Sequence, residues 1–166
     1  MRTTTILAVA LALAAPVAIA QDIDALERQL EKAREAAPMI VKPFVAVSRP
    51  AKYFGDYEAR PNNVYRKGEK LHFYAEPKNL VMSKGGGMYE PALEVDIEVA
   101  PEKGEAHKQP KFLSMKIPSR SRIQDLYLNM TVSLDNAPPG KYNVKFVIRD
   151  LNSKKSATVA QDVVFK

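Results

Sequence analysis

The chain has 166 residues and no cysteine, and its 25 Lys and Arg against 19 Asp and Glu give a formal net charge of +6. This length is typical of one domain, and the absence of cysteine excludes disulfides, thiol catalysis and cysteine-ligated metal sites. Charges of both signs are interspersed along the chain, which is typical of a solvated surface, although a basic face would also suit an anionic polysaccharide, a lipid head group or an acidic protein.

The first twenty residues have the layout of a secretory signal peptide. Arg2 supplies the charged start, an apolar run covers residues 6–20, and Ala18-Ile19-Ala20 has the pattern of a cleavage site. The run is too short and too rich in alanine for a transmembrane span, which needs about 20 strongly apolar residues. We expect cleavage after Ala20, no transmembrane segment in the mature chain, and a periplasmic or secreted location without a nucleic-acid partner. An uncleaved anchor is the alternative.

An export signal without any cysteine favours a bacterial envelope protein over a small animal secreted domain, which disulfides usually stabilise. The mature chain loses the charge of Arg2 and keeps a net charge of +5. It is long enough to bury a core without disulfides.

An amphipathic helix is predicted within residues 21–38. Apolar side chains recur every three or four residues and form one stripe: Ile23, Leu26, Leu30, Ala33 and Ala37. Pro38 ends the pattern, because the residue before proline avoids the helical region. The stripe is too short for a coiled coil, so it either packs on the following domain or pairs with a partner through Ile23, Leu26 and Leu30. An oligomer joined by this helix is one form of such pairing, and a half-ordered spacer is the alternative.

From residue 39 onward the apolar period changes to two, the period of β-strands. Strand-like runs lie at 40–47, 64–65, 71–76, 93–100, 112–117, 126–133, 142–149 and 157–165. Turns rich in Pro, Gly and Asn separate them, and no helix lies between them. Seven or eight such strands predict an all-β fold, an antiparallel immunoglobulin-like β-sandwich over residues 39–166. A barrel is the alternative.

Two stretches resemble bacterial secreted immunoglobulin-like and macroglobulin-type modules. Residues 134–165 resemble the closing hairpin of such modules, in which a Pro-Pro-Gly triplet, here 138–140, and Tyr142 lead into an alternating strand. Tyr142 would bury its ring while its hydroxyl caps a backbone group, as in a tyrosine corner. Residues 63–73 look like the entry strand of macroglobulin-type domains, with Lys67 where proline is usual. The resemblance implies a sandwich and an extracytoplasmic setting, not a reaction.

No motif in the sequence predicts catalysis, a cofactor or a metal. The two histidines, His72 and His107, lie far apart, as structural or solvated histidines usually do. Glu94, Asp96 and Glu98 would lie about 6–7 Å apart on one strand face, where they would suit a cation or an acid–base pair. A face paired with Lys or Arg of a neighbouring strand is the more common arrangement. We therefore expect no enzyme, and a hydrolase is the third hypothesis.

Aromatic and basic side chains supply the candidate binding residues. The candidates are Tyr53, Tyr57, Tyr74, Tyr89, Arg120 and Arg122. The tyrosines, if exposed together, would form a platform for sugar rings or for a protein, and burial in the core is the alternative. The two arginines lie in a basic loop that would hold an anionic glycan or an acidic partner, and a solvated turn is the alternative.

These patterns predict a non-enzymatic binding, adaptor or structural module of the envelope that acts through protein–protein contacts. A carbohydrate-binding module that uses the tyrosines and the basic loop is the alternative, so the expected partner is a protein or an envelope glycan. An exposed apolar stripe on the helix, or an open sheet edge, would favour the protein partner. An exposed aromatic strip beside the basic loop would favour sugar, and a carboxylate pair in a pocket would favour an enzyme.

Overall fold

The computed structural model of the protein describes residues 22–135 and 137–166. The predicted signal peptide and its cleavage site after Ala20 lie outside the described residues. The chain divides after Lys32 into an N-terminal unit and a second compact unit, residues 33–166. No helix among the described residues is long and apolar enough to cross a membrane.

The predicted N-terminal helix is confirmed as α1, Ile23–Ala36. Asp24 lies in its first turn, where the partial positive charge of the helix terminus favours a carboxylate. The Ala37 amide still donates to the Ala33 carbonyl, at 2.9 Å, and Pro38 then ends the helix because it has no N–H to continue the pattern.

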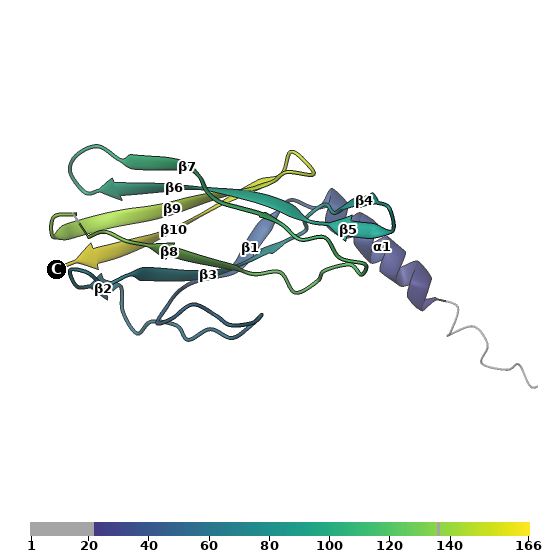
Figure 1. Ribbon diagram of the computed structural model, residues 1–166, viewed down its shortest axis with the longest axis horizontal. Coiled ribbons are helices and arrows are strands. Elements are labelled where there is room, and N and C mark those ends of the chain that lie inside the picture. The colour runs from purple at the N-terminus through teal and green to yellow at the C-terminus, as the bar shows by residue number, and fades with distance from the viewer. Residues whose placement is uncertain (1–21, 136) are drawn as a thin grey trace, which may run out of the picture. The chain divides into compact units, whose positions relative to one another are not determined.

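The predicted all-β sandwich is also confirmed, because the strands form two packed sheets of mostly antiparallel strands (Figure 1). The smaller sheet has the order β1 (Ile40–Val47), β3 (Leu71–Lys78), β8 (Leu128–Val132). The larger has the order β2 (Val64–Tyr65), β10 (Ser156–Phe165), β9 (Gly140–Asp150), β6 (Ala92–Pro101), β7 (His107–Lys116). A separate hairpin joins β4 (Ser83–Gly85) to β5 (Met88–Glu90). This hairpin and the C-terminus lie at opposite ends of the sandwich (Figure 1).

The core lies between the two sheets and follows the predicted alternation. Leu93, Val95 and Ile97 of β6 are buried, and the residues between them face outward. Phe73 of the smaller sheet and Phe146 of the larger sheet pack in an edge-to-face arrangement, with ring centroids 5.2 Å apart. Burial of one side chain of this size stabilises the fold by about 1.5–3 kcal/mol.

The predicted hydrogen bond of Tyr142 is confirmed. The Tyr142 ring is buried and its hydroxyl donates to the Pro138 carbonyl at 2.6 Å. A buried hydroxyl needs such a partner, and here the partner is only four residues away. This bond holds the corner that leads into β9.

Strand β7 differs most from the sequence-based prediction, which began it at residue 112. In the structure it begins at His107 and passes through Pro110, with an irregular register where it faces β6. Strand β7 is an outer strand, so proline there costs less than in a central strand. Lys111 has a φ of 52° and its amide donates to the Asp96 carboxylate at 2.8 Å, outside the strand ladder.

Candidate functional site

The predicted partner face of helix α1 is exposed. Ile23, Leu26 and Leu30 are 62%, 54% and 49% exposed, and no residue of this helix is buried. Scattered apolar residues are ordinary on a protein surface, whereas these three lie in one helical stripe and are exposed together. The structure therefore has one of the two features that favour a protein partner.

The last turn of α1 contacts residues within the second unit. Lys155 Nζ donates to the Arg34 carbonyl at 3.2 Å and to the Asn79 carbonyl at 2.8 Å. The Glu35 carboxylate lies 3.8 Å from the guanidinium of Arg122. This candidate arginine is therefore part of an internal ion pair, and it lines a cavity of about 250 Å³ together with Arg34. Only the other candidate arginine of the basic loop is exposed.

The four candidate tyrosines do not form one platform. Tyr74 is fully buried, with the rings of Tyr57 and Tyr127 stacked at centroid distances of 4.6 and 5.6 Å. Among the candidates, Tyr53 is 65% exposed and Tyr57 is 38% exposed, so these two side chains offer aromatic surface to a ligand and Tyr74 does not. Tyr74 is therefore removed from the candidate binding residues.

Tyr89 lies apart from that cluster, on strand β5. Its backbone exchanges two hydrogen bonds with Ser119, both at 2.8 Å, which places it beside the exposed Arg120. Lys84 lies over its ring at 5.5 Å from the centroid. The exposed part of the basic loop therefore adjoins one half-buried tyrosine, not an aromatic strip.

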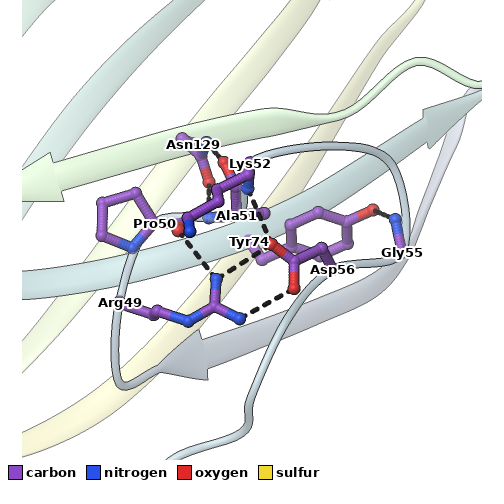
Figure 2. Close-up of polar contacts among 8 residues, drawn as sticks. All are labelled: Arg49, Pro50, Ala51, Lys52, Gly55, Asp56, Tyr74 and Asn129. Carbon is purple, nitrogen blue, oxygen red and sulfur yellow. Dashed lines mark hydrogen bonds and ion pairs between the residues drawn. The ribbon is translucent and has the colours of Figure 1, made fainter.

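A loop, residues 48–60, covers the outer face of β3 and β8, and polar contacts hold it there (Figure 2). The Gly55 amide donates to the Tyr74 hydroxyl at 2.8 Å, and this hydroxyl donates to Glu76 at 2.9 Å. Burial is the main cause that raises the pKa of Tyr74 to about 12. Within the loop, Arg49 pairs with Asp56 at 2.7 Å and its hydrogen bonds lower the pKa of Asp56 to about 2. Loop 48–60 thus forms a small additional layer that packs on the outer face of the smaller sheet.

The row of carboxylates on β6 is paired with basic residues of the neighbouring strand, as the more common arrangement predicts. Arg149 of β9 contacts Asp96 at 2.6 Å and Glu94 at 3.0 Å, and Lys145 contacts Glu98 at 2.7 Å. Hydrogen bonds from Arg149 and Lys145 are the main causes that lower the pKa of Asp96 and of Glu98. These residues lie on the outer sheet face and make an ion-pair ladder.

The two histidines lie in different surroundings. The Nδ1 atom of His72 is 2.9 Å from the Thr131 hydroxyl on the outer face of the smaller sheet, and burial lowers the pKa of His72. His107 begins strand β7 and is exposed. Within residues 22–135 and 137–166, no group of three or more His, Asp or Glu side chains is placed to hold a metal ion.

An apolar groove of about 820 Å³ opens between the sheets beside β7 and β8. Its apolar lining includes Ile97, Val99, Phe112, Val132, Leu134 and Tyr142. Strands β7 and β8 are outer strands of their sheets, so each pairs along one side. Sequence reasoning missed this groove because the order of strands in the sheets, which the sequence does not state, brings β7 and β8 to the same side.

Comparison with models of known protein families gives no match, and comparison with curated proteins gives no relative.

Proposed function

We propose that the protein is an exported, non-enzymatic binding module of the bacterial envelope that acts through protein–protein contacts. The observation that carries the proposal is the exposed stripe of Ile23, Leu26 and Leu30 on α1. The groove beside β7 and β8 adds less uncovered apolar surface, because Ile97, Val99, Val132 and Tyr142 of its lining are buried in the core. Such surfaces are kept on a soluble protein when a partner covers them.

The energetics of α1 favour a partner over a free helix. The helix has 14 residues, and an isolated helix shorter than about 12–15 residues is only marginally stable in water. Full burial of each of its three large apolar side chains would contribute about 1.5–3 kcal/mol. A partner that covers the stripe would therefore also stabilise the helix.

Further features of the chain support the location and the absence of catalysis. The sequence of residues 1–20 supports export. The Tyr142 corner supports kinship with extracytoplasmic immunoglobulin-like modules. The pairing of Glu94, Asp96 and Glu98 with Arg149 and Lys145 along the outer sheet face supports a structural role for this row of carboxylates.

Affinity co-purification of the tagged mature chain from native envelope extract, followed by mass spectrometry, tests the proposal. We compare the wild type with the double variant Leu26→Gln/Leu30→Gln, and with Arg28→Gln on the charged face as a control. The expected result is a stoichiometric protein that accompanies the wild type and the control but not the stripe variant. Equal recovery by all three, or a partnerless wild type, would contradict the proposal and make a glycan-binding screen the next experiment.

A further inference from the structure

We infer that the cavity of about 250 Å³ lined by Arg34 and Arg122 binds a free α-amino acid with an apolar side chain. The inference goes beyond the proposed protein-binding function, because the cavity lies within the second unit and does not include the exposed stripe. Its lining comes from the last turn of α1, from loop 48–60, from segment 76–82 at the end of β3 and beyond, and from residues 122–126 before β8. Sites for drug-sized ligands enclose about 300–1,000 Å³, so this cavity suits a smaller molecule.

Two arginines form the basic part of the lining and would hold the carboxylate of the ligand. Arg34 is half-buried, and among residues 22–135 and 137–166 its guanidinium has no hydrogen-bond or ion-pair partner. The side chain of Arg122 is 17% exposed, and its ion pair with Glu35 is long, at 3.8 Å. A guanidinium donates two parallel hydrogen bonds to a carboxylate, at about 2.7–2.9 Å. Arg34 therefore brings to the cavity a cationic donor that a ligand carboxylate would satisfy.

Glu76 forms the acidic part of the lining and would accept hydrogen bonds from the ammonium group of the ligand. Its side chain is only 8% exposed. One carboxylate oxygen accepts from the Tyr74 hydroxyl at 2.9 Å, whereas the other lies 3.6 Å from Lys78 Nζ, beyond hydrogen-bond length. A buried carboxylate is costly unless it is paired and hydrogen-bonded, so a ligand ammonium would complete its set of partners.

Apolar side chains complete the lining. Leu80, Met82 and Leu126 are buried, whereas Phe54 and Ile123 are half-buried. The two half-buried side chains keep accessible apolar surface, which an aliphatic side chain of the ligand would remove from water.

The combination of charges favours a zwitterion over a simple ion. A carboxylate without an ammonium group would meet the anionic Glu76 as well as the arginines, and an amine without a carboxylate would meet two guanidinium groups. The exposed Lys78 and Asp125 add one charge of each sign to the lining. Like charges placed together disfavour the wrong ligand, whereas an α-amino acid carries both required groups on one carbon.

Isothermal titration calorimetry of the full mature chain with l-leucine and, separately, with d-leucine tests the inference. We expect saturable binding of at least one enantiomer, at one site per chain. N-acetylleucine of the same hand lacks the ammonium charge, and leucinamide lacks the carboxylate. Each should bind at least about tenfold more weakly than leucine, because each loses a charge-assisted contact.

Substitutions in the cavity should reproduce these losses from the protein side. Arg34→Gln should weaken leucine binding at least about tenfold and narrow the difference between leucine and leucinamide. Glu76→Gln should narrow the difference between leucine and N-acetylleucine. Arg120→Gln changes an exposed arginine that does not line the cavity, and this matched control should bind leucine as the wild type does.

Thermal unfolding of each variant checks that the sandwich remains folded. If Glu76→Gln does not fold, the comparison of leucine with N-acetylleucine on the wild type decides the ammonium contact. Absence of saturable binding for both enantiomers, equal affinity for leucine and its two derivatives, or wild-type affinity in Arg34→Gln would overturn the inference. The stripe variant Leu26→Gln/Leu30→Gln should bind leucine normally while it loses the protein partner, so failure of the cavity assignment is distinguishable from failure of the proposed function.

Discussion

Asn129 and Ala51 exchange two hydrogen bonds although they lie 78 positions apart in the sequence (Figure 2). The Ala51 amide donates to the Asn129 side-chain oxygen at 2.9 Å, and the Asn129 side-chain nitrogen donates to the Ala51 carbonyl at 2.7 Å. The Asn129 side-chain amide thus bonds both backbone groups of Ala51, as a neighbouring strand would, and holds loop 48–60 against β8. Ala51 of this loop is buried in one small cluster with Val47 of β1 and Tyr74 of β3.

The substitution Asn129→Ala should destabilise the protein and release loop 48–60. It leaves two partly buried backbone groups of Ala51 without partners, at a cost of about 1–3 kcal/mol. A change of 1 kcal/mol corresponds to roughly 2–8 °C in Tm for a domain of this size class. Thermal unfolding and limited proteolysis would measure both effects. Asn143→Ala, which removes an exposed bond to Asp162, is the control and should cost about 0.5 kcal/mol or less. Equal losses of stability in Asn129→Ala and Asn143→Ala would contradict the conclusion that the bonds to Ala51 hold the loop.

The substitution Asp150→Ala should be more damaging than a typical surface change. The buried Asp150 carboxylate accepts hydrogen bonds from the Val81 amide at 2.9 Å, the Asn152 amide at 3.0 Å and the Ser153 hydroxyl at 2.7 Å. Hydrogen bonds to a charged group contribute about 1.5–3 kcal/mol each when lost singly, so we expect a loss of at least about 2 kcal/mol. Chemical denaturation measures it, with the exposed Asp162→Ala as control. A loss of unfolding free energy smaller than that of the control would refute the stabilising role of the Asp150 hydrogen bonds.

The pair Arg49–Asp56 predicts a stability difference that depends on pH. The folded pKa of Asp56 is lowered to about 2 from the ordinary value of 3.8. The stabilisation by this carboxylate is therefore fully present above about pH 4 and is lost as the pH falls toward 2. The Tm of the wild type should exceed that of Asp56→Asn at pH 5, and the difference should shrink toward zero near pH 2. A Tm difference that stays constant from pH 5 to pH 2 would show that the charge of the Asp56 carboxylate is not the source of the stabilisation.

Two deletions within the N-terminal helix should show that its first and last turns contribute differently to the stability of the sandwich. Deletion of residues 22–32 removes the exposed stripe without removing any residue of the second unit, so thermal unfolding of the sandwich should change little. Deletion of residues 22–37 also removes the Arg34 carbonyl and the Glu35 carboxylate, which contact Lys155 and Arg122. We expect a lower Tm for the longer deletion, measured by circular dichroism. Loss of the folded sandwich on deletion of residues 22–32 would contradict the division of the chain after Lys32.

The amino-acid sequence by itself determined the features that depend on neighbours a few residues apart. Helix α1 follows from a stripe with helical period and from Pro38. The inward and outward faces of β6 follow from strict alternation, because successive side chains of a strand point to opposite faces. The bond from Tyr142 to Pro138 was predictable because it spans four residues.

Only the tertiary structure decided the features that depend on which strands become neighbours. The pairing of β3 with β8 places Tyr127 against Tyr74, and the pairing of β6 with β9 supplies the arginine for Asp96. The sheet order also leaves β7 and β8 as outer strands beside one groove. Strand pairing is chosen by the packing of the whole core, across sequence separations that no local pattern encodes. The helix stripe was therefore visible in the sequence, whereas the groove beside β7 and β8 was not.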